Sequence, residues 1–529
     1  MSDARIDGPE LQQSANFTWV GEIPALGAAR CADRVALQFV DGRQTMTYAD
    51  LDRYSRAFAA LIHARGIGEG DRIAYLGRNS DLFYPVLFGS IRARCVLVPL
   101  NWRLAPPEIR YQLQHAGVRW VISDAEFEPT VQQIARDFDT EFQFLLTEDV
   151  AGRAGLRNLL RAIAPQARDE PIDPDRTILL LYTSGTTGNP KGVQLTHRAL
   201  SLSRHAELCA PDLAHLEMAC VLASPMPNFH IGGISWVLMG LARFGTVHIT
   251  GDSTASGLLK LLRQSGARHL FTVASVIRGI VDELHTSHEP APQLTGMYYG
   301  AMPMDEQLVR DAIDLFACRF VQFFGMTENG GSASMLGPKD HDLSVPGRLK
   351  SVGKPYPGMS LEIRGSDRRL LQRGEHGEIW VRSPTLTNGY WNMPEQTHAA
   401  IIDGWYATGD GGYLDENGYL FLTDRIKDMI ISGGENVYPI EVEQALRSHA
   451  AVLDAAVVGE ADIQWGERIV AFVQLRPAAQ VSAEALQTFV RQHIAGFKCP
   501  KAIRFVSELP RTASGKVQRS KLRSQPSIA

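Results

Sequence analysis

Apolar and polar positions along the chain follow two different spacings. After Thr47, apolar residues recur at helical spacing, which predicts a helix that Thr47 caps and Gly66 ends; these residues are Leu51, Tyr54, Phe58, Leu61 and Ile62. Ile178–Leu181 is instead a short unbroken apolar run, typical of a buried parallel strand. Because signals of these two kinds alternate over most of the length, the chain is predicted to be α/β.

The last hundred or so residues predict a smaller α+β unit. Its expected strands and helices are Met429–Ile431, Pro439–Leu446, Ala451–Val458, Ile469–Leu475, a helix capped by Ser482, and Ile503–Val506. A unit of this size can hold its own core. We place the boundary in the polar segment Asp424–Asp428, which divides residues 1–424 from residues 425–529.

Composition narrows the class of protein. Of the 529 residues, 45% are hydrophobic and 21% are charged, which excludes a mainly disordered chain, and the net charge of −5 disfavours a nucleic-acid partner. No apolar run reaches the roughly 18 residues of a membrane span, and the N-terminus lacks a signal-peptide pattern, so a cytoplasmic protein is expected. The six cysteines form no CxxC pair, so a metal would be held by oxygen ligands.

The stretch Tyr182–Gly192, YTSGTTGNPKG, follows the predicted strand and carries the clearest chemistry. Its glycines turn backbone N–H groups toward a ligand, its hydroxyls add donors, and Lys191 adds a positive charge, which together suit a polyphosphate. The residues are Thr183, Ser184, Gly185, Thr186, Thr187, Gly188 and Lys191. The Walker A pattern does not fit, because Pro190 stands where its second glycine belongs. A plain Gly/Thr-rich surface loop is the alternative interpretation.

This loop resembles the signature of the adenylate-forming superfamily, which includes acyl-CoA synthetases, adenylation domains of peptide synthetases, and luciferases. Five further matches run in the family's order: Tyr299–Pro303, Phe324–Glu328, Gly404–Asp410, Asp424–Asp428 and Pro510–Lys516. Phe324 stands where the family usually has tyrosine, which leaves aromatic stacking intact and puts a hydroxyl contact in doubt. The resemblance implies a large N-terminal adenylate-forming domain of layered sheets and helices, with a small mobile C-terminal domain.

The resemblance also implies a reaction and its co-substrates. A carboxylate attacks the α-phosphate of ATP with Mg²⁺, which gives an acyl-adenylate and pyrophosphate, and the thiol of coenzyme A then displaces AMP. Thr327 would contact the α-phosphate and Glu328 would hold Mg²⁺, with Thr183 as a second ligand. Asp410, in what we expect to be a tight loop, and Arg425 would bind the ribose. The other implied nucleotide-binding positions are Gly300, Ala301, Met302, Pro303, Phe324 and Gly325.

Residues toward the C-terminus are implied to change roles between the two steps. The family's matching lysine, here Lys516, stabilises charge on the α-phosphate during adenylation. Lys427 occupies the hinge position, and Gly433 and Gly434 would help line the pantetheine tunnel after rotation of the C-terminal domain. The family places His230 between the acyl pocket and the thiol tunnel, although a lone histidine beside apolar residues is commonly a core residue.

The sequence specifies the acid least well. Expected pocket residues are Phe229, His230, Trp236, Tyr298, Tyr299, Gly300, Gly325 and Met326, with the two glycines leaving room for the acyl group. The pattern most resembles medium- to long-chain fatty acid–CoA ligases, and the alternatives are an aryl or alicyclic acid–CoA ligase or an adenylation enzyme that loads a separate carrier protein. A nucleotide-binding protein without activity is a further rival. A homodimer is compatible with the sequence.

Overall fold

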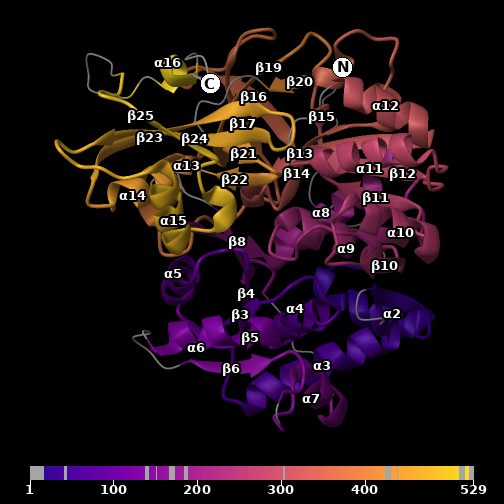
Figure 1. Cartoon of the computed structure of the whole chain (residues 1–529). Coiled ribbons are helices and arrows are strands. Elements are labelled where there is room, and N and C mark those ends of the chain that lie inside the picture. Colours follow the sequence, from indigo (N-terminus) through magenta and orange to yellow (C-terminus); the bar gives the residue numbers. More distant parts are fainter. Residues whose placement is uncertain are drawn as a thin grey trace.

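The computed structural model describes residues 17–40, 44–136, 142–150, 152–165, 173–183, 189–301, 304, 306–422, 430–437, 439–510, 517 and 519–523. Four sheets organise these residues, and helices pack on the larger two (Figure 1). The six-stranded sheet lies at the bottom of Figure 1, the nine-stranded sheet at the right, and the two five-stranded sheets toward the top. The chain is therefore α/β with a smaller α+β part at its C-terminal end, as the hydrophobic pattern predicts.

The six-stranded sheet contains the predicted strand Ile178–Leu181 as part of β7. Its order is β6-β5-β3-β4-β7-β8, parallel except for β8. The strands are β3 (Arg72–Leu76), β4 (Val96–Leu100), β5 (Val118–Ser123), β6 (Gln143–Leu146), β7 (Thr177–Thr183) and β8 (Lys191–Thr196). The helix predicted after Thr47 is α3 (Tyr48–Ala64), and the Thr47 side chain accepts a hydrogen bond from the Asp50 N–H. Gly66 follows it with a φ of +71°.

The nine-stranded sheet has the order β15-β14-β13-β12-β11-β9-β10-β1-β2, with a parallel centre and antiparallel edges. Its strands are β1 (Val35–Phe39), β2 (Gln44–Thr47), β9 (Val221–Ser224), β10 (Thr246–Ile249), β11 (His269–Thr272), β12 (Gly296–Gly300), β13 (Arg319–Met326), β14 (Gly331–Leu336) and β15 (Lys354–Pro355). The parallel strands point their carboxyl ends toward one edge, where ligands of α/β sheets ordinarily bind.

Helices connect and cover these two sheets. They are α2 (Ile23–Cys31), α4 (Phe83–Arg92), α5 (Pro106–Ala116), α6 (Glu128–Arg136), α7 (Leu156–Ala162), α8 (His197–Cys209), α9 (Ile231–Ala242), α10 (Ala255–Ser265), α11 (Ala274–Ser287) and α12 (Glu306–Phe316). Helix α9 has an almost wholly buried surface, since ten of its twelve residues, Gly233–Ala242, lie in the core. No helix in the described ranges is both long and apolar enough to span a bilayer.

A five-stranded sheet follows the nine-stranded one along the chain. Its strands are β16 (Ser360–Arg364), β17 (Gly377–Arg382), β18 (Ile401–Ile402), β19 (Trp405–Leu414) and β20 (Leu420–Leu422), and α13 (Pro394–Ala400) precedes β18. All its pairings are antiparallel. The segment between β17 and α13 reaches back to the six-stranded sheet, because Val193 and Tyr390 form an antiparallel bridge.

The second five-stranded sheet is built entirely from residues after 429, and we call residues 430–523 the C-terminal lobe. Its strands are β21 (Ile430–Ser432), β22 (Glu435–Val437), β23 (Val452–Asp462), β24 (Gly466–Leu475) and β25 (Ala502–Phe505), with helices α14 (Pro439–Arg447), α15 (Ala483–His493) and α16 (Arg519–Arg523). Every element predicted for this region is present, and Ser482 caps α15 by accepting from the Ala485 N–H. The predicted boundary and the hinge residue Lys427 lie outside the described residues.

Candidate active site

Four predicted motifs begin where parallel strands end. Strand β7 ends at Thr183, β9 at Ser224, β12 at Gly300 and β13 at Met326. The segments that follow carry the polyphosphate loop, His230, Ala301 and Thr327. Because the strands within each sheet run parallel, each pair of neighbouring ends delivers its motif to one edge. Motifs that are far apart in the sequence are therefore brought close together, because they follow the ends of neighbouring parallel strands.

Glu328 is held in the turn Thr327–Asn329, directly after β13. Its side chain is 8% exposed, and its Oε1 accepts a hydrogen bond of 3.0 Å from the Tyr390 hydroxyl. Its backbone carbonyl accepts from the Thr387 N–H at 2.8 Å. No described residue bonds to its second carboxylate oxygen. Tyr390 thus holds one carboxylate oxygen, and the second has no described partner.

Tyr390 joins this carboxylate to the predicted polyphosphate loop. Strands β7 and β8 flank that loop and pair as a hairpin in which Thr183 lies opposite Lys191. The Lys191 ammonium nitrogen lies 4.7 Å from the centroid of the Tyr390 ring, within cation–π range. The next residue, Trp391, donates its N–H to the Gly192 carbonyl at 2.7 Å. Lys191 and Glu328 are therefore gathered around one tyrosine, and Thr183 lies opposite Lys191 on the neighbouring strand.

Sequence reasoning missed Tyr390. It lies in a loop whose only signal is the aromatic pair Tyr390–Trp391 after Gly389, which predicts no chemistry by itself. Its hydroxyl also lies 3.4 Å from that of Tyr406, inside the predicted motif Gly404–Asp410. Tyr390 thus connects three of the motifs that the sequence singled out.

Asp410 does not lie in the tight loop expected from the sequence. It is in the middle of strand β19, where Gly409 has a φ of +73° and donates its N–H to Glu378 Oε1 at 2.9 Å. The Thr408 hydroxyl accepts from the Asp410 N–H at 3.0 Å. The pairing register between β17 and β19 shifts at this point. A β-bulge, and not a turn, therefore orients Asp410, because glycine tolerates the positive φ.

At the two positions where we expected glycine to make room for the acyl group, a neighbouring strand leaves no room for a side chain. A Cβ on Gly300 would lie 2.5 Å from the Phe323 carbonyl, and one on Gly325 would lie 2.0 Å from the Gly331 carbonyl. The space beside each is filled by a neighbouring strand, so the expectation that they open the pocket is wrong. Ala301 has a φ of +64°, an unfavourable conformation for alanine that is commonly found at functional sites.

The expected aromatic pocket residues do not all face one space. Along β12, Tyr298 and Tyr299 point to opposite faces of the sheet, as strand geometry requires. The ring centroids of Tyr298 and Trp236 lie 4.7 Å apart, whereas the Tyr299 hydroxyl forms a hydrogen bond of 3.0 Å with His341 Nε2 on the other face. Tyr299 is therefore part of the core under α11 and α12, and its assignment to the acyl pocket is wrong.

A second group of charged side chains joins the C-terminal lobe to the edge that carries His230. Glu435, at the start of β22, forms ion pairs with Arg103 and, at 3.3 Å, with His230 Nε2 (the latter when protonated). The chain reaches Glu435 through Gly433 and Gly434, whose φ values of +59° and +81° suit a two-residue hairpin turn. A Cβ on Gly434 would lie 3.6 Å from Val273. The Gly-rich turn thus packs against the N-terminal part of the chain.

Electrostatics favour the ionised form of Glu435. Burial acts to raise the pKa of its carboxyl, but the neighbouring His230 and Arg103 outweigh burial, and the pKa lies below its ordinary value. A buried carboxylate of this kind is stable only while its partners remain in place. The lobe and the His230 edge are therefore coupled through one charge.

A second ion-pair cluster joins the C-terminal lobe to helix α5. The Lys498 ammonium contacts Glu108 on α5 at 2.8 Å and Glu441 on α14 at 3.0 Å. Burial acts to lower the pKa of Lys498, but the two carboxylates outweigh it and raise the pKa. Lys498 is 4% exposed, so this contact is shielded from solvent.

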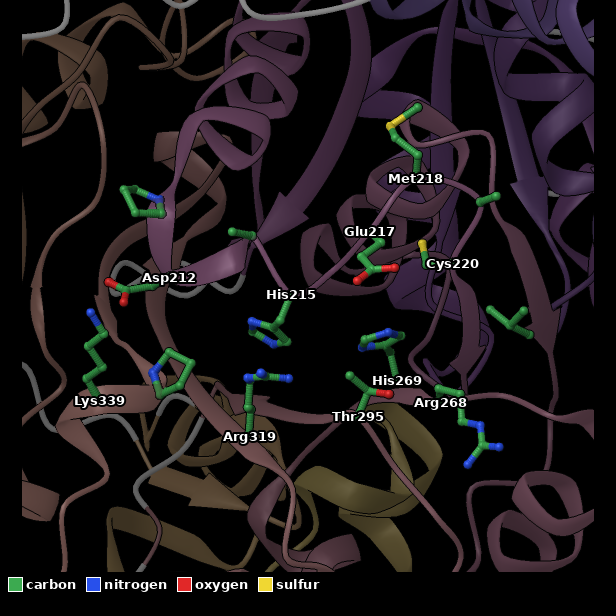
Figure 2. A pocket seen from close by; sticks show the side chains of 15 residues that line it. Asp212, His215, Glu217, Met218, Cys220, Arg268, His269, Thr295, Arg319 and Lys339 are labelled. Atoms are coloured by element: carbon green, nitrogen blue, oxygen red, sulfur yellow. The ribbon is translucent and has the colours of Figure 1, made fainter.

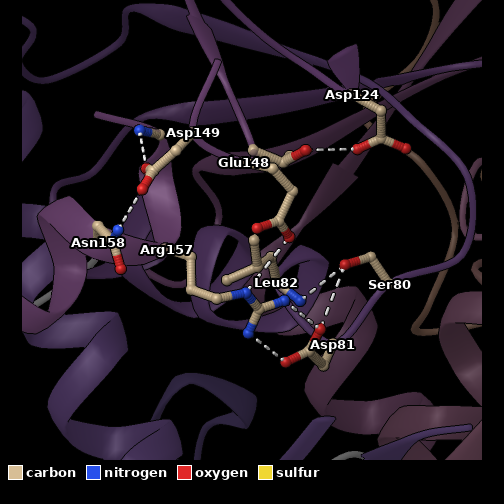
Figure 3. A network of polar contacts seen from close by, with 10 residues as sticks. Ser80, Asp81, Leu82, Asp124, Glu148, Asp149, Arg157 and Asn158 are labelled. Atoms are coloured by element: carbon tan, nitrogen blue, oxygen red, sulfur yellow. Dashed lines mark hydrogen bonds and ion pairs between the residues drawn. The ribbon is translucent and has the colours of Figure 1, made fainter. Parts of the chain in front are cut away.

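The loop before His230 is fixed from the six-stranded sheet. The Asn79 amide donates to the carbonyls of Met226 and Thr250, both at 3.0 Å, and its oxygen accepts from the Asn228 N–H at 3.0 Å. Figure 3 shows how the neighbouring Asp81 is held by both terminal nitrogens of Arg157, each at 2.9 Å. This network positions the loop that delivers His230, whose side chain remains 43% exposed.

A cavity lies at the opposite edge of the nine-stranded sheet. It has a volume of about 690 Å³ and opens beside the starts of β9, β11, β12 and β13. Figure 2 shows His215, His269 and Arg319 around it, and the Tyr298 hydroxyl bonds to His215 at 2.9 Å and to His269 at 3.2 Å. None of the sequence-predicted site residues lines this cavity.

Several predicted site residues fall outside the described part of the chain. They are Ser184, Gly185, Thr186, Thr187, Gly188, Met302, Pro303, Arg425, Lys427 and Lys516. Phe324 is described and packs on the cluster beside the sheet of β16–β20, on the face of β13 opposite to Phe323. Its predicted nucleotide contact remains a prediction.

Comparisons with known proteins give one consistent result. The AMP-binding enzyme family matches residues 26–391, and the C-terminal domain of AMP-binding enzymes matches residues 441–516. A fatty acid–[acyl-carrier-protein] ligase, ScoC of Streptomyces coeruleorubidus, is 35% identical over 98% of this chain and 98% of its own. A feruloyl-CoA synthase of Amycolatopsis is 34% identical over 91% of this chain and 94% of its own.

One solved enzyme, with two different bound ligands, matches this chain with two different TM-scores. The o-succinylbenzoate CoA synthetase MenE of Bacillus subtilis, as a double mutant with a product analogue, OSB-NCoA, gives a TM-score of 0.85 at 29% identity over 96% of this chain and 98% of that chain. The same enzyme with its acyl-adenylate intermediate gives a TM-score of 0.67 at 28% identity, over 96% and 98%.

Proposed function

The chain belongs to the family of AMP-binding enzymes, as an AMP-forming acid–thiol ligase of the acyl-CoA synthetase branch, and we propose that free coenzyme A accepts its acyl group. In the first step the carboxylate of the acid attacks the α-phosphate of ATP and pyrophosphate leaves. In the second step the thiol attacks the acyl carbon and AMP leaves. Both are displacements that positioned charges accelerate without a covalent enzyme intermediate.

The phosphate end of the site is assigned to the residues around Tyr390. Thr327 and Lys191 bind the phosphates, Asp410 and Arg425 bind the ribose, and Lys516 stabilises charge on the α-phosphate. The other members of the polyphosphate loop and the segment Gly300–Pro303 hold the nucleotide. The meeting of Lys191 and Glu328 at Tyr390, with Thr183 opposite Lys191, is the observation that carries this assignment.

The donor set at Glu328 fits Mg²⁺. One carboxylate oxygen is held by Tyr390 and the other has no described partner, so Glu328 would supply one hard oxygen ligand, with Thr183 as a second. Bound there, Mg²⁺ would neutralise charge on the phosphates of ATP. Described residues contain no group of three or more Asp, Glu, His or Cys that could hold a metal, so phosphates and water would supply the other ligands.

The thiol end is assigned to the contact between Glu435 and His230. This contact places the Gly433–Gly434 turn against Val273, beside the loop that carries His230. The higher TM-score with the MenE complex that holds a product analogue supports a thiol-accepting orientation of the C-terminal lobe. We infer that adenylation uses a second orientation, reached by rotation at Lys427.

Two experiments test the reaction. AMP release from a panel of acids should require free coenzyme A, and release that requires an acyl carrier protein would favour the activity for which ScoC is named. Pyrophosphate exchange into ATP tests the first step alone. Absence of exchange with every acid would contradict an active ligase and favour a nucleotide-binding protein without activity.

The acid is proposed from resemblance. A medium- to long-chain fatty acid remains the first candidate, and an aryl or alicyclic acid is the alternative. Relatives act on both kinds of acid, since ScoC is named for a fatty acid and the Amycolatopsis enzyme for a feruloyl group. The panel should therefore contain alkyl and aryl acids of similar length.

A further inference from the structure

A buried polar cluster lies behind helix α9, and none of the predicted site residues belongs to it. Arg204 and Glu207 on α8, Ser235 on α9 and Tyr356 after β15 form it, and each is at most 9% exposed. We call these four residues the α8–α9 cluster. Ser235 follows His230 by five positions on the helix that His230 caps. The cluster is therefore close to the thiol end of the site along α9.

Contacts hold the members of the cluster together. Arg204 pairs with Glu207 through one terminal nitrogen, and the other donates to the Ser235 carbonyl at 2.6 Å. Arg243 donates to the Glu207 carbonyl at 2.8 Å. Tyr356 interacts electrostatically with Glu207 and with Arg204. Two guanidinium groups and one carboxylate thus share a buried region.

Each member of the cluster also has one buried polar atom without a hydrogen-bond partner in the described structure. These atoms are Arg204 Nε, Glu207 Oε2, Ser235 Oγ and the Tyr356 hydroxyl oxygen. A buried polar group without a partner is strongly unfavourable, so these four atoms are suited to bind a polar group. Three of the atoms carry a hydrogen to donate, and Glu207 Oε2 accepts.

The space beside Gly331 connects the cluster to the reacting end. A Cβ built on Gly331 would have the Ser235 hydroxyl at 3.7 Å and nothing else within 4 Å. Gly331 lies opposite Met326 in the pairing of β13 and β14, and Met326 directly precedes Thr327. Phe323, on β13, lies 6.3 Å from Tyr356 between ring centroids. An acyl group that starts at Thr327 would thus run past Gly331 toward Ser235.

Resting on the proposed function, we propose that the acid activated here carries a hydroxyl group at the end remote from its carboxylate, and that the α8–α9 cluster binds this hydroxyl. A hydroxyl donates to Glu207 Oε2 and accepts from the donors around it, so one group satisfies both kinds of unpaired atom. An alkyl end would leave them all unpaired. Phe323 lies beside Tyr356 and contacts Phe271, which contacts Trp236, so an aromatic group adjoins the cluster.

A second carboxylate fits this region less well than a hydroxyl. Burial raises the pKa of Glu207 to about 7, although Arg204 and Arg243 act to lower it. The region therefore already disfavours its own negative charge, and a dicarboxylic acid would add another. A neutral hydroxyl has no such repulsion.

Matched acids test the proposal. The probes are cinnamate against 4-hydroxycinnamate and octanoate against 8-hydroxyoctanoate, with octanedioate as the dicarboxylate, each assayed for coenzyme A-dependent AMP formation. In at least one pair, kcat/KM for the hydroxy acid should exceed that for its partner by about tenfold or more, because the unsubstituted acid leaves buried groups unpaired. Equal values in both pairs, or a preference for octanedioate, overturns the proposal and leaves the ligase activity standing. No turnover with any acid overturns both.

Variants test the residues themselves. Ser235→Ala and Tyr356→Phe should each reduce the ratio of the two kcat/KM values toward one, mainly by lowering the value for the hydroxy acid. The matched control is Ser201→Ala: Ser201 is buried on α8, the helix of Arg204 and Glu207, and its hydroxyl already bonds to the His197 carbonyl and the Val20 N–H. Ser201→Ala should keep the ratio of the native enzyme. A ratio that Ser235→Ala and Tyr356→Phe also leave unchanged would overturn the assignment of the cluster.

Discussion

The phosphate end and the thiol end of this ligase are assembled in different ways. At the phosphate end, Glu328, Tyr390 and Lys191 all come from residues before 423 and contact one another directly or through Tyr390. At the thiol end, Arg103 and His230 meet a carboxylate from the C-terminal lobe, across 332 residues of sequence in the case of Arg103. The first thus rests on residues before the C-terminal lobe, and the second depends on where the lobe is docked.

This difference separates the two half-reactions experimentally. Changes at the phosphate end should affect adenylation, and changes at the contact with the lobe should affect thioester formation. Pyrophosphate release measures the first, and thioester formation from supplied acyl-AMP measures the second. If the lobe rotates as proposed, Lys516 should act in one half-reaction only.

Lys516→Ala should have the largest effect. Adenylation should slow by about a hundredfold or more, because a positive charge is removed from where negative charge develops on the α-phosphate. Thioester formation from supplied acyl-AMP should remain close to that of the native enzyme. Equal slowing of both half-reactions would contradict the two-orientation account.

Glu435→Gln should have the second-largest effect, and it should slow thioester formation instead of adenylation. The amide keeps a carbonyl acceptor but loses the charge that pairs with Arg103 and His230, which should cost about 2 kcal/mol, or roughly thirtyfold in the rate of thioester formation. Adenylation should be unaffected. The measurement is the single-turnover rate of thioester formation from acyl-AMP.

A matched control for Glu435→Gln is available within the lobe. Glu460 pairs with Arg468 and Arg504, which are both lobe residues, so Glu460→Gln removes a similar charge without touching the contact. It should leave both half-reactions near their native rates. If the two variants slowed thioester formation alike, the effect would belong to the stability of the lobe and not to its docking.

The contrast between the two ends also marks what the sequence could predict. Local spacing predicted the caps at Thr47 and Ser482, the strand before the polyphosphate loop and six elements of the lobe, because these signals act within a few residues. Strand β22 and helix α16 were not predicted. Tyr390, Arg103 and Lys498 carry no such signal, since their partners are distant in sequence. The glycines misled us, because a missing side chain looks the same whether a ligand or a neighbouring strand fills the space.

Glu328→Gln should act only at the phosphate end and more weakly. An amide oxygen is a poorer ligand for Mg²⁺ than a carboxylate, so the Mg²⁺ concentration that half-saturates pyrophosphate release should rise by about tenfold. Saturating Mg²⁺ should restore most of the rate. An unchanged half-saturating concentration with normal turnover would remove Glu328 from the metal site.

Tyr390→Phe should have the smallest effect, and this effect should be confined to adenylation. It removes the hydroxyl that fixes one oxygen of Glu328 but leaves the ring that lies near Lys191. A hydrogen bond that only orients a ligand contributes about 1 kcal/mol, so the half-saturating Mg²⁺ concentration for adenylation should rise a few-fold. Because no part of the C-terminal lobe contributes to this contact, thioester formation from supplied acyl-AMP should be unchanged.

The decisive measurement is the double variant with Glu328→Gln: if Tyr390 acts through that carboxylate, the double variant should need no more Mg²⁺ than Glu328→Gln alone. Additive shifts would instead mean that Tyr390 acts on the phosphates independently, through Lys191.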